Sequence, residues 1–556
     1  MASIMVDTLI IGSGVAATAV AQRLLEADPF ASVTILEAGN RIKTKDFALW
    51  EDYLLTGKLP YDPYKDLKYP ARETPGENAS VGGTIVPLEG ARVFGYGGST
   101  MHWGGWSFRM KPEDFYARTN CGEAIDWPFD YDVLEPYYCQ AEAYLAVAGN
   151  SSDPSLRRSQ PYPFRHFPFT LEDRPVIDAF ETLSIRYGHL PIARRGHSEV
   201  PSRHAPCQTT GTCKYCPFGA RFVASNYLDD LAEWNDFPNL ELKLGAVVQS
   251  IRTAGKSRAV GVTYVDRTTG NSVDLDAQRI ILAAGAIESA KLLLRSTPAE
   301  WPEGVGNDHD LVGRHLVTHP FLIFAGTLPA NPMRLQAEMD FPTLVSRHFD
   351  SLAEQKSGKY ILVNPADPAK FSLARRMQSG YSRAEIDAAL TGPTTFEFNG
   401  MLEVFGRFQN RVANHPKVNR LGMIETSVDY TMDPGFEARI GEIREVVAKV
   451  YAAMGATVPG KPSVSWRADH AASVCRMSPD PSQGVVDADL RVHGVDNLYV
   501  CSNAVMPNIG AVNPTLTLTA LALKLGDHLR LKSRLGERHV VPGEKVPAAR
   551  LAANSP

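Results

Sequence analysis

Residues 6–37, VDTLIIGSGVAATAVAQRLLEADPFASVTILE, decide the fold of this chain. A buried-strand pattern over 6–11 runs into a glycine-rich turn, and an apolar helix is expected over 19–25. A second strand over 33–36 ends in Glu37. This order of strand, turn, helix and strand is typical of the βαβ unit that binds dinucleotides.

Each polar or small residue of the turn has a physical role in that interpretation. Gly12 allows the tight turn, and Gly14 lets the backbone approach a pyrophosphate at the helix N-terminus. Ala17 permits close packing of the helix on the strand, and Glu37, about twenty residues further on, is placed to accept hydrogen bonds from a ribose. The sequence therefore predicts a bound dinucleotide.

Bulk composition narrows the class of protein. At 556 residues the chain is too long for one ordinary core, so two domains or one domain with a large second lobe are expected. Its 44% apolar and 21% charged residues are typical of a soluble globular protein, and a net charge of −5 argues against nucleic-acid binding. No apolar run reaches the ~18 residues that indicate a membrane span.

Several segments between the motifs have weaker patterns. Residues 41–80 and 150–200 are rich in Pro, Tyr or Arg and are expected to be largely irregular. An amphipathic helix is expected over 134–147. Residues 279–289 repeat the order of strand and glycine turn, with a helix expected over 290–295, and residues 330–465 are expected to form a separate lobe of strands and helices.

Three distant blocks point to one family. The fingerprint at 12–17, the turn AAGAIES at 283–289 and GAVNPTLTLTALA at 510–522 together resemble the glucose-methanol-choline (GMC) flavoprotein oxidoreductases. The resemblance covers about 1–330 and 465–535. The NPTLT form and the His-Trp dipeptide at 102–103 are most similar to the sugar-oxidising branch, which includes pyranose oxidases and FAD-dependent sugar or glucoside dehydrogenases.

The resemblance implies an α/β fold, with a Rossmann-like FAD-binding domain and a second, sheet-based substrate-binding domain. It divides the chain into three parts. The discontinuous FAD-binding domain takes residues 1–45, 80–120, 205–330 and 465–535. The substrate-binding domain with its excursions takes residues 46–79, 121–204 and 331–464, and the tail takes residues 536–556. The cofactor-binding residues that it implies are Gly12, Gly14, Ala17, Glu37, Gly97, Gly98, Ser99, His102, Trp103, Val248, Ala284, Gly285, Asn503, Pro514 and Thr515.

The block DHAASVCRM at 469–477 matches the catalytic histidine motif of that family. Oxidation of an alcohol by a flavin needs a base for the hydroxyl proton while the hydride goes to flavin N5, and neutral histidine is such a base near neutral pH. The resemblance assigns this role to His470 and the second catalytic position, which is His or Asn in the family, to Asn513. This chain has Ser473 and Val474 where the family usually has Gly-Thr.

Two further features bear on the flavin. Pro514 suits the first turn of a helix whose positive end would face the flavin pyrimidine ring and stabilise the anionic reduced form. The glycine cluster at 95–105 lets the backbone pass close to a flat ring, and in pyranose oxidases the histidine of the matching dipeptide is bonded covalently to the flavin. At His102 we expect packing beside the flavin, with a covalent bond as the alternative. Asn120 and Trp127 are candidate pocket residues.

Cys207, Cys213 and Cys216, followed by Pro217, form a C-x5-C-x2-C-P cluster. Three thiolates in one loop are typical of iron–sulfur ligation, and several sugar dehydrogenases of the family carry a [3Fe-4S] cluster in the matching segment. A zinc site with His204 as the fourth ligand and three reduced thiols without a metal are the alternatives.

The expected activity is FAD-dependent oxidation of a sugar or glycoside ring hydroxyl to a ketone, as in glucoside 3-dehydrogenases, with the electrons passed to an external acceptor. Alternatives are a pyranose or glycoside oxidase that uses oxygen, another GMC alcohol oxidase of the sterol or choline type, and a non-catalytic electron relay. The expected partners are the sugar substrate, a small subunit that carries the export signal and a cytochrome c-type acceptor. No signal peptide is recognised before the first strand, which fits either a cytoplasmic enzyme or co-export to the periplasm with that subunit.

Overall fold

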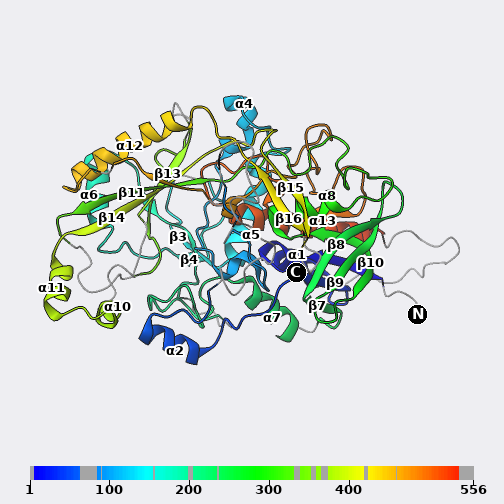
Figure 1. The fold of residues 1–556 in the computed structure, drawn as a ribbon, viewed down its shortest axis with the longest axis horizontal. Helices are drawn as coiled ribbons and strands as arrows, with labels where there is room; N and C mark the ends of the chain where they lie inside the picture. Colours follow the sequence, from blue (N-terminus) through cyan, green and yellow to red (C-terminus); the bar gives the residue numbers. More distant parts are fainter. Residues whose placement is uncertain are drawn as a thin grey trace, which may run out of the picture.

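The computed structural model describes residues 5–62, 84, 86–88, 91–154, 157–197, 204–234, 237–330, 339–351, 358–364, 373–418, 424–458, 460–466 and 468–536. Two large sheets lie in opposite halves of the molecule (Figure 1). The described helices are α1 (Val15–Ala27), α2 (Phe47–Thr56), α4 (Ala117–Cys121), α5 (Tyr131–Tyr144), α6 (Arg174–Thr182), α7 (Ala224–Trp234), α8 (Gly285–Arg295), α10 (Leu373–Gln378), α11 (Arg383–Thr391), α12 (Phe436–Ala453) and α13 (Thr515–Gly536). A small third sheet has the order β4-β3-β6 and is formed by β3 (Val147–Gly149), β4 (Phe164–Arg165) and β6 (Ile192–Ala193).

The first sheet is the dinucleotide-binding sheet, at the right of Figure 1. Its parallel strands lie in the order β7-β2-β1-β10-β18, with the antiparallel pair β9 and β8 continuing from β10. The strands are β1 (Val6–Ile11), β2 (Val33–Glu37), β7 (Leu240–Leu244), β8 (Ala246–Thr253), β9 (Ala259–Asp266), β10 (Ser272–Leu282) and β18 (Leu498–Val500). The predicted α/β fold is thereby confirmed.

The parallel strands contain a point at which the order of connection reverses. From β1 the chain crosses through α1 to β2 on one side, and from β10 it continues through α8 and later enters β18 on the other side. The connections that leave the carboxyl ends of the adjacent parallel strands β1 and β10 therefore run in opposite directions along the sheet. Open α/β sheets bind ligands in the crevice at such a switch point.

Several helix boundaries differ from those expected. Helix α1 begins at Val15 and α8 at Gly285, directly after their glycine turns, because small residues let each helix start against the sheet. Helix α5 covers residues 131–144 and not 134–147. The Asp130 side chain caps it by accepting a hydrogen bond from the Val133 N–H, and Ala146, with φ of 54°, leads out of it.

The two segments expected to be irregular also contain helices. Helix α2 lies within 41–80, capped by Asp46 at its start and ended by Gly57, whose φ is 68°. Helix α6 lies within 150–200 and places its apolar side against the second sheet. Both start signals, an Asp at the cap of α2 and a Pro in the first turn of α6, are present in the sequence but were outweighed by the overall polar composition.

The second sheet lies at the left of Figure 1, is antiparallel throughout and has the order β17-β11-β14-β13-β12-β5. Helices α6 and α12 pack together against it, and α12 contacts β11. Its strands are β5 (Gly188–His189), β11 (Pro320–Leu328), β12 (Leu344–Ser346), β13 (Tyr360–Val363), β14 (Thr394–Leu402) and β17 (Ser463–Trp466). The ribbon of β15 (Arg411–Val418) and β16 (Ile424–Asp429) packs instead on α8 of the first half.

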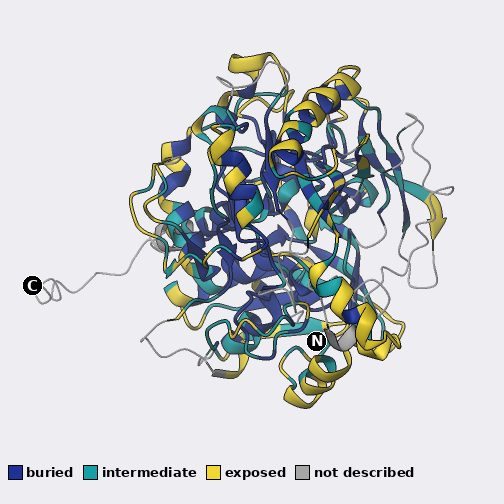
Figure 2. Cartoon of the chain, turned by 90° about the vertical axis from the view of Figure 1, so that its left-hand side faces the viewer, coloured by how far each residue is buried: buried dark blue, intermediate teal, exposed yellow. Residues whose placement is uncertain are grey.

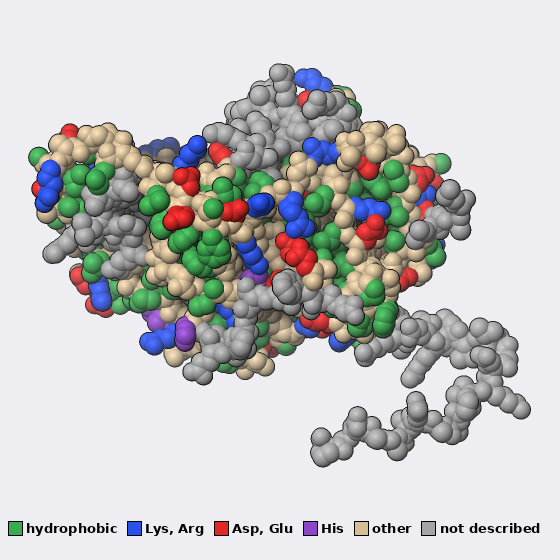
Figure 3. Space-filling view, turned by 90° about the horizontal axis from the view of Figure 1, so that it is seen from below, with side chains coloured by type: hydrophobic (Ala, Val, Ile, Leu, Met, Phe, Trp, Pro, Cys, Tyr) green, Lys and Arg blue, Asp and Glu red, His purple; other side chains and the backbone are tan. Residues whose placement is uncertain are grey.

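The buried apolar side chains form one large cluster around the first sheet and a second cluster between the second sheet and helices α6 and α12. Figure 2 shows exposed residues on outer helices and loops, and the end of β15 is exposed as well. Figure 3 shows Lys and Arg interspersed with Asp and Glu, without a single-sign stripe on that face. Among the described residues, no helix combines the length and apolar character needed to cross a membrane. The tail, predicted over 536–556, lies outside the described residues apart from Gly536.

Candidate active site

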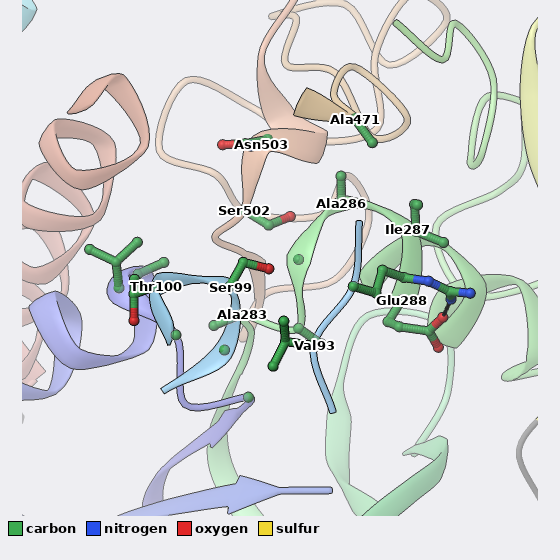
Figure 4. Close-up of a pocket in the computed structure, with 18 of the residues that line it drawn as sticks. Val93, Ser99, Thr100, Ala283, Ala286, Ile287, Glu288, Ala471, Ser502 and Asn503 are labelled. Carbon is green, nitrogen blue, oxygen red and sulfur yellow. Dashed lines mark hydrogen bonds and ion pairs between the residues drawn. The ribbon is translucent and has the colours of Figure 1, made fainter. Parts of the chain in front are cut away.

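A cavity of about 520 Å³ lies at the switch point of the first sheet. Its floor is formed by the turns that follow β1 and β10, and its walls by the glycine cluster, by η4 (Ala468–His470) and by the start of α13. Figure 4 shows it between the segment that carries Ser99 and Thr100 and the start of α8 with Ala286 and Glu288. Five distant parts of the chain therefore meet around one space.

The two glycines of the first turn differ in the space around them. Gly12 has a φ of 101°, and a Cβ at this position would lie 2.6 Å from the carbonyl oxygen of Ala283 in the turn after β10. Gly14 has ordinary φ, and an added Cβ would meet no atom within 4 Å. Space beside Gly14 is thus open in the protein alone, as a site for a closely approaching pyrophosphate requires.

Glu37 lies at the end of β2, as predicted, and lines the cavity. Its carboxylate accepts hydrogen bonds from the Ser13 hydroxyl at 2.6 Å and from the Gly39 N–H at 2.7 Å. Burial is the main effect on this group and raises its pKa, while these hydrogen bonds lower it. Ser13, which sequence reasoning missed, also accepts a hydrogen bond from the Gly97 N–H and so ties the glycine cluster to the first turn.

Most of the predicted cofactor residues line this cavity. Those that do are Gly12, Gly14, Glu37, Gly98, Ser99, His102, Trp103, Val248, Ala284, Gly285, Asn503 and Thr515, together with His470 and Asn513. Ala17 is buried in α1, and neither it nor Gly97 or Pro514 is in the lining. Asn120 is exposed on α4 and Trp127 is buried beside Phe115, so neither belongs to the cavity.

His470 and Asn513 lie next to each other. The Nδ2 of Asn513 is 3.2 Å from Nε2 of His470. The other ring nitrogen, Nδ1, is 2.9 Å from Nδ1 of His319, whose own Nε2 is 2.8 Å from the carbonyl oxygen of Gly510. The site is therefore a hydrogen-bonded row from Gly510 through two histidines to an amide.

The chain brings His319 to His470 through a short antiparallel bridge. Val317, two residues before His319, exchanges backbone hydrogen bonds with Ala472, two residues after His470. Strand β11 begins directly after His319, and Phe321 of that strand lies 5.5 Å from the His470 ring, centroid to centroid. The second sheet thus supplies one wall of the active site.

Ser473 is the residue at which this chain departs from the family pattern. Its φ is 69°, in the left-handed region that favours glycine, at the position where the family usually has Gly. Its N–H donates to the Asn503 carbonyl oxygen, and the following Cys475 N–H donates to Ala504. Serine therefore adopts here a left-handed backbone conformation that glycine adopts without strain.

Two buried amide oxygens face the cavity without a partner among the described residues. They are Oδ1 of Asn503 and Oδ1 of Asn513, and both residues line the cavity. A buried amide oxygen normally accepts a hydrogen bond. The unpaired oxygens, the open space at Gly14 and the apolar walls fit a dinucleotide with a flat ring system.

The three cysteines lie away from this cavity, on a loop beside α2. Burial raises the pKa of Cys207 and of Cys213, and the guanidinium of Arg194 partly opposes both shifts. Arg194 is buried, and its Nε has no hydrogen-bond partner in the described part of the chain. In the same part, no three His, Cys, Asp or Glu side chains converge as ligands of one metal ion.

Sequence reasoning missed His319. It is fully buried, and burial lowers its pKa to about 4, so the ring is neutral at physiological pH. It is 151 residues before His470 and belongs to no motif. The only local signal is a histidine at the start of an alternating strand.

Comparison with known proteins supports this description. Models of the GMC oxidoreductase family match residues 192–321 and 409–522. The chain is 26% identical to the large subunit of fructose dehydrogenase from Gluconobacter japonicus, over 94% of this chain and 97% of that one. It is 30% identical to the 6'''-hydroxyparomomycin C oxidase of Streptomyces lividus, over 77% of each chain.

Solved structures agree on the fold. The crystal structure of pyridoxine 4-oxidase from Mesorbium loti superposes with a TM-score of 0.63 at 20% identity, covering 94% of this chain and 99% of that one. A formate oxidase structure gives 0.64 at 16% identity, over 96% of this chain and 99% of that one. The chain belongs to the GMC oxidoreductase family, whose members are flavin-dependent enzymes that oxidise CH–OH groups.

Proposed function

We propose that this protein uses FAD to oxidise a ring hydroxyl of a sugar or glycoside to a ketone, in the manner of a glucoside 3-dehydrogenase, with His470 as the base. The observation that carries the proposal is the pair of His470 and Asn513 at the wall of a cavity suited to a dinucleotide. When bound, FAD would supply the acceptor for the hydride that leaves the substrate carbon.

The residues of the chain would perform the other half of the reaction. Nε2 of His470 takes the hydroxyl proton, and the Asn513 amide N–H, which already reaches this nitrogen, holds the substrate oxygen as negative charge develops on it. The substrate loses one hydride and one proton, and the product is the ketone. Loss of the base is expected to slow turnover by ~10²–10⁴-fold.

Two relatives favour a sugar-like substrate. One is named for fructose and another for hydroxyparomomycin C. The experiment is a steady-state survey of hexoses, glucosides and simple alcohols, with the product identified by NMR. A 3-keto sugar from a glucoside is the expected product; oxidation of primary alcohols alone would contradict the proposal.

The electron acceptor has two candidates. The fructose relative is named a dehydrogenase with a large subunit, which supports transfer to an external acceptor and a multi-subunit assembly. The hydroxyparomomycin relative is named an oxidase, which favours oxygen as the alternative. Turnover measured with a dye, with cytochrome c and with oxygen alone separates them, because only an oxidase forms peroxide at a rate equal to substrate consumption.

The cysteine loop would carry electrons from the flavin to the external acceptor. Cys207, Cys213 and Cys216 supply the three thiolates that a [3Fe-4S] cluster takes, and the buried cation of Arg194 offsets negative charge there. Metal binding requires deprotonated thiols, so the side chains would converge and lose their protons together. Iron and sulfide assays test the cluster. A pull-down from the native host tests the small subunit and cytochrome, and fractionation distinguishes periplasm from cytoplasm.

A further inference from the structure

The two histidines at the active site form a row whose proton positions can be assigned from their partners. A backbone carbonyl oxygen only accepts, so Nε2 of His319, 2.8 Å from Gly510, carries a proton. Burial keeps His319 neutral by lowering its pKa to about 4, so its Nδ1 carries only a lone pair. The proton between the two Nδ1 atoms therefore belongs to His470.

This assignment determines the reactive side of His470. A neutral imidazole with its proton on Nδ1 has a lone pair on Nε2. That nitrogen faces Asn513 at 3.2 Å, and an amide N–H is the group that can donate to it. The orientation of the Asn513 amide, with Nδ2 toward the ring and Oδ1 elsewhere, agrees with this arrangement.

We propose that His319 is a positioning residue that holds His470 in the Nδ1–H tautomer, so that the base presents an unprotonated Nε2 to the substrate hydroxyl. This inference rests on the proposed role of His470 as the base. His319 itself makes no contact with the substrate side of the ring, since the planes of the two rings are 89° apart and its partners are Gly510 and His470.

The surroundings of His319 hold the arrangement in place. Gly510 has a φ of 53°, and a Cβ there would lie 3.0 Å from Oδ2 of Asp114. Asp114 is buried and forms an ion pair with the buried ammonium of Lys359, so the loop behind His319 is packed against a fixed charge pair. The charged neighbours of this row are Asp114 and Lys359 behind Gly510, and Asp469 beside His470. Lys359 also lies 3.7 Å from Glu403 and 4.0 Å from Glu113.

A second effect follows during turnover. When His470 accepts a proton on Nε2, both of its ring nitrogens carry protons, and its Nδ1–H needs an acceptor. The lone pair of His319 is that acceptor at 2.9 Å. Without it, the imidazolium would lose a buried hydrogen bond, and the acidic limb of the pH profile of kcat/KM would move to lower pH.

The test compares three variants of the FAD-loaded enzyme. His319→Leu removes the acceptor. His319→Gln keeps an acceptor and a donor, because the amide oxygen and nitrogen are bonded to one carbon, as the two ring nitrogens of His319 are bonded to Cε1. His189→Leu is the matched control, because His189 has a pKa also lowered to about 4 but lies on β5, outside this cavity. FAD content and melting temperature confirm that each variant is folded and loaded.

The direct readout is ¹⁵N NMR of histidine-labelled protein, with the His470 signals assigned by their loss in His470→Gln. We expect a protonated Nδ1 and an unprotonated Nε2 in the wild type and in His319→Gln, and a mixture of tautomers in His319→Leu. In parallel, kcat of His319→Leu should fall by ~10²-fold, with KM changed far less and partial recovery in His319→Gln.

The outcomes separate this inference from the proposed function. A proton on Nε2 in the wild type, or an unchanged Nδ1–H tautomer in His319→Leu, overturns the inference. If the tautomer changes in His319→Leu but kcat equals that of the wild type, the positioning role is supported and the assignment of His470 as the base fails.

Discussion

At the scale of single residues, His319 links stability to pH. Its pKa is about 4 in the folded chain and 6.5 in the unfolded chain. Between these pH values the unfolded chain binds a proton that the folded chain does not. The contribution of His319 to the free energy of unfolding therefore rises from pH 4 to 6.5 and is lost as pH falls through this window. The free energy of unfolding contributed by His319 differs by about 3 kcal/mol between the two ends of this pH window.

The variant His319→Gln has no titrating group at this position. We therefore expect its melting temperature to fall less than that of the wild type between pH 6.5 and 4.5, measured by circular dichroism. His189→Gln, which removes a second histidine whose pKa is lowered to about 4, should reduce the pH dependence of the melting temperature in the same way. An identical pH dependence in wild type and His319→Gln would show that His319 is protonated in the folded protein.

Ser473 tests the strained turn behind His470. At a φ of 69° a β-branched side chain is strongly disfavoured, whereas glycine adopts this conformation without strain. We expect Ser473→Val to lower the free energy of unfolding by about 1–3 kcal/mol and Ser473→Gly to change it by less than about 1 kcal/mol. Urea unfolding measures both; equal losses in the two variants would point to the hydroxyl and not to the backbone.

The sequence predicted individual residues where a motif contained them. His470 and Asn513 were named from their blocks, and the structure places them 3.2 Å apart. His319 escaped because its function depends on a bridge between Val317 and Ala472, which no local pattern encodes. The role of Ser13 was not predicted, because the fingerprint accepts any residue between its first two glycines.

At the scale of elements, the turn after β1 gives a pair of variants with different expected effects. Gly14→Ala meets no protein atom within 4 Å, so the protein without cofactor should keep its stability while FAD affinity falls at least about tenfold. Gly12→Ala places a Cβ 2.6 Å from the Ala283 oxygen at positive φ and should lower both. Fluorescence titration with FAD and thermal melts of the apoprotein measure the two quantities.

Gly441→Ala on the exposed side of α12 is the control, since its Cβ also meets nothing within 4 Å. It should leave FAD affinity unchanged and stabilise the helix by ~0.5–1 kcal/mol. Unchanged FAD affinity in Gly14→Ala would show that no cofactor group approaches this turn.

The cysteine loop gives a prediction of metal content. If Cys207, Cys213 and Cys216 hold a [3Fe-4S] cluster, the wild type purified without oxygen should contain about three irons per chain, and Cys213→Ser should lose most of them. Cys121→Ser, at an exposed cysteine on α4, is the control. Equal iron content in the wild type and Cys213→Ser would show that these cysteines do not hold an iron–sulfur cluster.

Elements with a strong pattern were predicted well. Strand β1 has the predicted bounds, and β2 extends the strand predicted over 33–36 by one residue, to Glu37. Helix ends were less accurate, because caps such as Asp130 and left-handed residues such as Ala146 decide them. Helices α2 and α6 were missed because their packing partners are distant in sequence.

At the scale of the whole molecule, the active site belongs to neither sheet alone. The first sheet supplies the turns of the dinucleotide cavity, and the segment that leads into β11 of the second sheet supplies His319. The resemblance predicted a two-part architecture, but not that β11, within the segment expected for the first part, would lie in the second sheet. Such an assignment depends on strand pairing across the chain, as between β11 and β14.

A single-turnover experiment addresses directly whether this chain oxidises a sugar hydroxyl with FAD and His470. The FAD-loaded enzyme is mixed with glucosides in the absence of oxygen and of any other acceptor. We expect the visible flavin band of the wild type to bleach while one keto sugar forms per flavin, and the band of His470→Gln to bleach ~10²–10⁴-fold more slowly. Bleaching of His470→Gln at the wild-type rate, or no bleaching by any sugar or glycoside, would contradict this expectation.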